Sequence, residues 1–105
     1  MPRRAVSDTV WNRIEKTLPV RTTGPSGGRP ALPDREALEG ILFVLRHGIL
    51  WSELPKGLKY GCGMTCFRRL RTWQAAGAWK RVERTLKKEL RGADSIDWER
   101  AWVRS

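Results

Sequence analysis

Arginine and threonine side chains gather on one side of residues 64–76, and both residue types can read DNA. At about 100° per residue, the angle of an α-helix, four of them share a face and a fifth lies at its boundary. These residues are Thr65, Arg68, Arg69 and Thr72, with Arg71 at the boundary. Arginine has forked donors that bind guanine in the major groove, and threonine can contact a base edge, a thymine methyl or a phosphate. Because the opposite face is apolar, the segment has the pattern of a recognition helix.

Further cations flank this segment. Between Leu54 and Val82 the chain has seven Lys and Arg residues and no Asp or Glu. We expect four of them to contact phosphates, which sets affinity more than specificity. These four are Lys56, Lys59, Lys80 and Arg81. Arg29, within Gly28-Arg29-Pro30, matches the core of arms that place arginine in the minor groove, although an ordinary linker can also contain one arginine.

Residues suited to catalysis or metal binding are sparse. Cys62 and Cys66 form a single C-x3-C pair, and His47 is the one histidine of the chain. A structural zinc site needs four ligands, so we expect two reduced thiols. Asp97 and Glu99 would share a face if the tail were a strand, but no third ligand is visible and solvated carboxylates are the simpler interpretation. We therefore expect no catalytic residue, metal or cofactor.

Composition sets the class of partner. The chain has 105 residues, a net charge of +10 and an isoelectric point of about 10.8, which indicates one small domain with a polyanionic partner. Nucleic acid is the first candidate and an anionic membrane surface the second. No stretch approaches the roughly 20 apolar residues of a membrane span. The N-terminal residues lack the apolar segment of a signal peptide, so we expect a cytoplasmic protein with no membrane partner.

Apolar spacing predicts four helices that would position these side chains. They cover residues 7–18, 34–47, 64–76 and 78–91, with Gly48 as a C-cap of the second. The run at 41–45 taken alone could be a buried strand, but the full length of its pattern favours a helix. The acids at the start of the second helix are interpreted as solvated or as complementing the helix dipole. These are Asp34, Glu36 and Glu39.

The tail has a different period. Ile96, Trp98 and Trp102 alternate as in a β-strand, although the chain offers no strand to pair with. We therefore predict an all-α fold, a small helical bundle with a helix-turn-helix, plus a short strand-like C-terminal tail. The organisation is an N-terminal helix at 1–18, a flexible strap at 19–31 rich in Pro and Gly, and a helix-turn-helix DNA-binding domain at 32–92.

Three stretches in order resemble a known family. They are GGRPALPDREALEGILFVLRHGILWSELP, YGCGMTCFRRLRTWQAAGAW and IDWERAWVRS. Together they are similar to the N-terminal domain of bacterial insertion-sequence transposases of the insertion-sequence-five family, in the DDE class with an RNase H-like catalytic core. The resemblance covers residues 7–105. It implies a helical domain that binds the terminal inverted repeats of the element, with double-stranded DNA as the partner.

The same resemblance places the first catalytic Asp just after a segment like Ala101-Trp102-Val103. Arg104 stands there in this chain, so residues 93–105 are expected to be the start of a truncated RNase H-like domain, and the chain alone is expected not to be an enzyme. It would be either the first-frame product of a frameshifted gene, with the full-length transposase as a further partner, or a decayed remnant.

Three other interpretations stay open. A free-standing helix-turn-helix repressor would form a stable dimer on a palindrome away from any mobile element. An RNA-binding accessory protein would prefer single-stranded RNA with stacked bases. A helical domain whose basic face is merely solvated would bind DNA with a salt dependence near zero.

Overall fold

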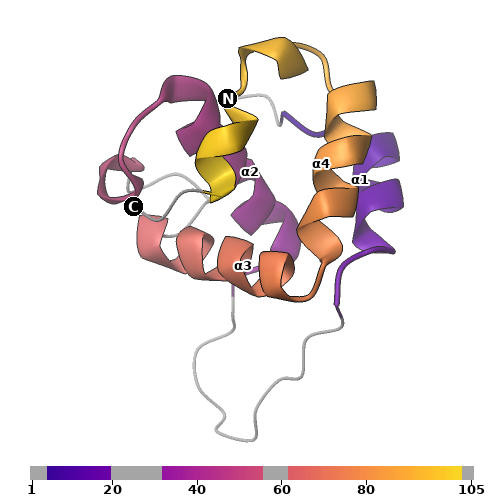
Figure 1. Ribbon diagram of the computed structural model, residues 1–105, viewed down its shortest axis with the longest axis horizontal. Helices are drawn as coiled ribbons and strands as arrows, with labels where there is room; N and C mark the ends of the chain where they lie inside the picture. Colours follow the sequence, from indigo (N-terminus) through magenta and orange to yellow (C-terminus); the bar gives the residue numbers. More distant parts are fainter. Residues whose placement is uncertain (1–4, 20–31, 56–61, 103–105) are drawn as a thin grey trace, which may run out of the picture.

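A computed structural model of the protein describes residues 5–19, 32–55 and 62–102, and within them it has four α-helices and three short 3-10 turns. The α-helices are α1 (Asp8–Glu15), α2 (Asp34–His47), α3 (Gly63–Ala75) and α4 (Ala78–Glu89). The 3-10 turns are η1 (Trp51–Glu53), η2 (Ala93–Ser95) and η3 (Trp98–Trp102). Figure 1 shows α2 in the middle, α3 along one edge, and α4 beside α1. The predicted all-α class is confirmed.

Helix α2 is the centre of the hydrophobic core. Its predicted apolar stripe, Leu38, Ile41, Leu42 and Leu45, is buried along its whole length. Trp73 of α3 and Trp79 of α4 stack beside it, with ring centroids 6.5 Å apart and an interplanar angle of 12°. Buried side chains from residue 6 near the N-terminus to residue 101 in the tail belong to the same cluster. In the described part of the chain, no helix has the length and apolar character needed to cross a membrane.

The connection from α2 to α3 depends on two glycines. Gly48 ends α2 in the left-handed region, with φ of 64°, as predicted for a C-cap. Gly63 begins α3 against η1, where an added Cβ would lie 1.6 Å from the carbonyl oxygen of Trp51. Only glycine allows this approach, so η1 lies directly against the start of α3.

The tail is helical where a strand was predicted, so that prediction was wrong for residues 98–102. Its backbone forms turns, including Arg100 N to Asp97 O at 3.2 Å, and does not pair with another strand. The predicted alternation fails with it, since Ala101 is buried and Trp102 is 42% exposed. Arg104 lies outside the described residues.

Side-chain contacts explain why the tail folds back onto the helices. The guanidinium of Arg100 donates to the carbonyl oxygens of Val44 (3.2 Å) and Ile49 at the end of α2. Gln74 of α3 donates to the carbonyl oxygen of Ala101. These bonds give partners to carbonyl oxygens near the end of α2 and to the carbonyl oxygen of Ala101 in the tail.

Two of the three acids at the start of α2 are structural, so their interpretation as solvated groups was wrong. Glu39 is 4% exposed, and its carboxylate accepts hydrogen bonds from the backbone N–H groups of Ala5 (2.8 Å) and Val6 (2.9 Å). Asp34 accepts from Arg69 of α3. Arg35 donates to the carbonyl oxygen of Val6 at 2.8 Å. Helix α2 therefore holds both the N-terminal segment and α3 through charged side chains.

Candidate nucleic-acid interface

Helix α3 has a buried side and an outer side, as its periodicity predicted. Cys66, Leu70 and Trp73 are buried against α2 and α4, and Phe67 is half-buried beside Trp51, with ring centroids 5.4 Å apart. The residues exposed along the outer side are Met64, Arg68, Thr72, Ala75 and Ala76. We call this set, with the half-buried Thr65 and Arg71 at its margins, the outer face of α3.

Arg68 lies at the middle of this face. It is exposed, and Thr72 one turn later donates its hydroxyl to the carbonyl oxygen of Arg68 at 3.0 Å. The hydroxyl proton is therefore engaged, which leaves the oxygen as an acceptor and the methyl group for contacts with a partner. Helix α3 carries no acidic residue to oppose an approaching phosphate.

Arg69 occupies a different environment from the one that its sequence position suggested. Its side chain is 12% exposed, and its Nη1 lies 2.6 Å from Oδ1 of Asp34 on α2. The prediction that Arg69 lies on the exposed face was wrong, because this ion pair turns its guanidinium toward α2, where it links the two helices. Arg69 thus links α3 to α2, and Arg68 is the exposed arginine on the outer face.

Arg71 lies at the margin, as predicted. Its guanidinium carbon is 5.7 Å from the centre of the Phe67 ring, and Nη1 donates to Oε1 of Gln74 at 3.3 Å. The cation–π contact and the hydrogen bond orient the guanidinium, and the side chain of Arg71 stays half-buried.

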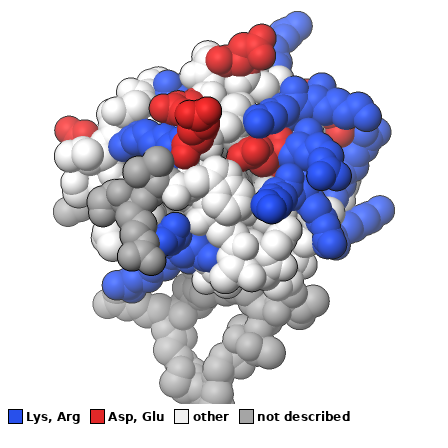
Figure 2. Space-filling model, viewed as in Figure 1, with Lys and Arg blue, Asp and Glu red and all other residues white. Residues whose placement is uncertain are grey.

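Helix α4 has the larger basic surface. Lys80 and Arg81, the two predicted phosphate contacts on this helix, are both exposed. Figure 2 shows Lys and Arg gathered over α4. Three further exposed cations were not among the predicted contacts, namely Arg84, Lys87 and Lys88. Their positions on the polar side of a strongly amphipathic helix were the sequence signal that could have identified them.

The remaining predicted residues are placed as follows. Lys56, Lys59 and Arg29 lie outside the described residues. Cys62 is an exposed thiol and Cys66 a buried one, and neither forms a disulfide. A hydrogen bond with the Thr65 hydroxyl lowers the pKa of Cys62, whereas burial raises the pKa of Cys66 to about 11. Among residues 5–19, 32–55 and 62–102, no three His, Cys, Asp or Glu side chains come together as a metal site.

Comparisons with known proteins point to bacterial mobile elements. The model of a family described as "Putative transposase of IS4/5 family" matches residues 6–83, a span that includes α1, α2, η1 and α3. The chain is 46% identical over 109 residues to the "Insertion element IS402 uncharacterized 16.2 kDa protein" of Burkholderia cepacia, in an alignment that covers all of this chain and 73% of that protein. No solved structure matches the chain.

Proposed function

The chain belongs to the IS4/5 family of insertion-sequence transposases, and on this premise we propose that it binds the terminal inverted repeats of an insertion element through the outer face of α3. The role assigned to these residues is recognition of duplex DNA, not strand cleavage. The observation that carries the proposal is the exposed Arg68 on a helix that has no acid and is fixed to α2 by its neighbour Arg69.

The proposed arrangement places α3 in the major groove. Arg68 binds a guanine edge with its forked donors, and the methyl of Thr72 packs on a thymine methyl or another apolar base edge. Rigid attachment supports this role, because an anchored helix presents a donor fork in one orientation and loses little conformational entropy on binding. The Asp34–Arg69 pair and the Gly63 approach to Trp51 supply that rigidity.

Phosphate contacts on the flank supply affinity without sequence preference. Lys80 and Arg81 follow α3 after a short turn at Gly77, so they are placed beside the end of the recognition helix. If about five phosphates are contacted in all, the logarithm of the association constant should fall with the logarithm of salt concentration with a slope near −4.5.

The test separates specificity from affinity. Fluorescence anisotropy compares a duplex carrying the terminal repeat with a shuffled duplex of equal composition. Arg68→Ala should weaken binding to the repeat by about 1–3 kcal/mol and have a much smaller effect on the shuffled duplex. Lys80→Ala should weaken both duplexes about equally.

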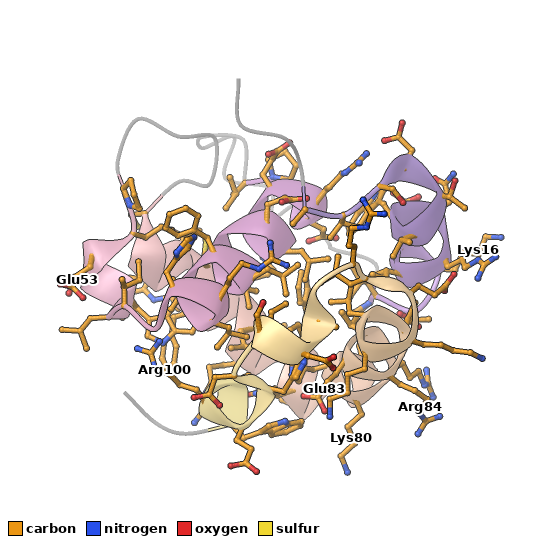
Figure 3. The ribbon with its side chains drawn as sticks, turned by 90° about the horizontal axis from the view of Figure 1, so that it is seen from above. Lys16, Glu53, Lys80, Glu83, Arg84 and Arg100 are labelled. Atoms are coloured by element: carbon orange, nitrogen blue, oxygen red, sulfur yellow. The ribbon has the colours of Figure 1, made fainter. Side chains whose placement is uncertain are left out.

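Lys16→Ala is the control, because it removes one exposed positive charge from the end of α1 (Figure 3). It should leave the preference for the repeat unchanged. Equal losses on both duplexes for Arg68→Ala, in a variant with an unaltered circular dichroism spectrum, would contradict the assignment of α3 as the recognition helix.

A further inference from the structure

A shallow depression lies between α4 and the C-terminal tail. It has a volume of about 400 Å³ and is lined by Lys80, Glu83, Arg84, Lys87 and Trp102. Figure 3 shows Lys80, Glu83 and Arg84 side by side on α4, next to the tail. No residue of α3 lines it, so the depression is separate from the outer face of α3 and shares only Lys80 with the duplex contacts proposed above.

Trp102 differs from the other tryptophans of the chain. Its ring is 42% exposed, whereas Trp11, Trp51, Trp73 and Trp79 are buried and Trp98 is half-buried. The indole N–H of Trp102 donates to Oε1 of Glu83 at 3.3 Å, which ties the edge of the ring to α4. The tail thus holds a large aromatic surface at the rim of the depression.

The charge of the lining is positive although it contains one acid. Glu83 accepts from Trp102 with one oxygen, and its other oxygen lies 3.3 Å from Nζ of Lys87. Its side chain is only 18% exposed, so it acts on these two neighbours more than on solvent. Lys80, Arg84 and Lys87 are exposed around it. The ligand that fits is an anion with a flat apolar part.

An unpaired nucleotide has this chemistry. We propose that the depression binds single-stranded nucleic acid, with one base stacked on Trp102 and the adjoining phosphates on Lys80, Arg84 and Lys87. Stacking on an aromatic ring within a basic groove is the usual way in which proteins bind single strands. A duplex cannot use the ring in this way, because each base face within it is covered by the next base pair.

The first experiment uses the intrinsic fluorescence of the protein. A 12-nucleotide oligothymidine should quench tryptophan emission, and the quenching should disappear in Trp102→Ala because most of the other rings are shielded. Affinity measured by anisotropy of a labelled oligothymidine should fall roughly 5- to 150-fold in this variant. Trp102→Phe, which keeps an aromatic face, should retain most of the affinity.

Leu50→Ala is the control for loss of an apolar surface, because Leu50 is 59% exposed and does not line the depression. It should bind oligothymidine as the unaltered protein does. If Trp102→Ala, with unaltered thermal melting, also binds with unaltered affinity, the proposal is wrong.

A matched pair of lysines tests the phosphate contacts. Lys87 lines the depression and Lys88, also exposed on α4, does not. Each change to Ala removes one charge, so a difference in binding between the two variants reports a contact in the depression and not the change in net charge. Lys87→Ala should reduce the steepness of the salt dependence for oligothymidine by about 0.7, the value for one phosphate on a single strand, and Lys88→Ala should not.

Two further comparisons define the ligand. Oligodeoxyuridine and oligouridine carry the same base and differ only in the 2′-hydroxyl, so comparing their affinities tells whether the sugar matters. Arg68→Ala should leave oligothymidine binding unchanged while it weakens binding to the repeat duplex, and Trp102→Ala should do the reverse. This double dissociation lets either assignment fail alone. Loss of oligothymidine binding in Arg68→Ala equal to that in Trp102→Ala would mean that single strands bind on α3, and would overturn the inference.

Discussion

Helices α2 and α4 both carry many charged residues, yet they use them in opposite ways. On α2 two acids have partners inside the fold, since Glu39 accepts from the backbone of Ala5 and Val6, and Asp34 pairs with Arg69. On α4 five Lys and Arg residues are exposed, and its acids pair with residues at the surface. Helix α2 thus uses charged side chains to assemble the fold, whereas α4 leaves its positive side chains exposed to an anionic partner.

This difference shows why a count of charges does not locate a binding surface. A charge with a buried partner contributes to the orientation of helices, while an exposed charge contributes to long-range attraction and is screened by salt. Removing Glu39 or Asp34 from α2 should therefore change stability, and removing an exposed cation from α4 should change binding.

The largest expected effect concerns the core of α2. Leu42 is 1% exposed, so Leu42→Ala should lower the free energy of unfolding by about 2–5 kcal/mol through lost burial and a residual cavity. In a domain this small, that loss is a large share of the total stability. Leu50→Ala, which truncates an exposed leucine, should change it by less than about 0.5 kcal/mol. Urea titration followed by circular dichroism measures both, and similar values would place α2 outside the core.

The next effect compares two acids. Glu39→Gln should cost about 1.5–3 kcal/mol, because a neutral amide weakens the charge-assisted bonds and turns a donor toward a backbone N–H group. Glu83→Gln on α4 should cost less than about 0.5 kcal/mol, since its ion pair is at the surface. The same urea titration applies. A Glu39→Gln protein as stable as the parent would show that the N-terminal segment is not held by this carboxylate.

A smaller effect is expected at the α2–α3 join. Arg69→Ala should cost about 1–2 kcal/mol of stability, because it leaves Asp34 without this largely buried cation. Lys88→Ala on α4 should stay within about 0.5 kcal/mol. Thermal melting of the two variants decides the matter. If Arg69→Ala instead melts like the parent but loses sequence preference on DNA, Arg69 belongs to the reading surface after all.

The smallest effect concerns chemical reactivity, with stability unchanged. The thiolate is the reactive form, and the pKa of Cys62 is lowered while that of buried Cys66 is raised to about 11. At pH 8 iodoacetamide should therefore modify Cys62 in the folded protein and Cys66 only after denaturation. Peptide mass spectrometry identifies the labelled thiol. Equal labelling of both in the folded state would mean that the inner side of α3 opens readily.

Local patterns in the sequence were sufficient for the helices and for the two sides of α3. The stripe from Leu38 to Leu45 and the glycine at 48 define α2 without reference to the rest of the chain. They were insufficient for Arg69 and Glu39, because the partners that decide their roles are 35 and about 34 positions away. The strand prediction for the tail failed for the same reason, since alternating apolar residues cannot reveal that Arg100 reaches the end of α2.

The bonds made by Arg100 and Gln74 also have a mechanical consequence. They tie the tail to the ends of α2 and α3, so a movement of either helix would pull on Ala101 and its neighbours. If α3 binds DNA as we propose, a reorientation of α3 on its target would therefore be passed on to the tail through these hydrogen bonds.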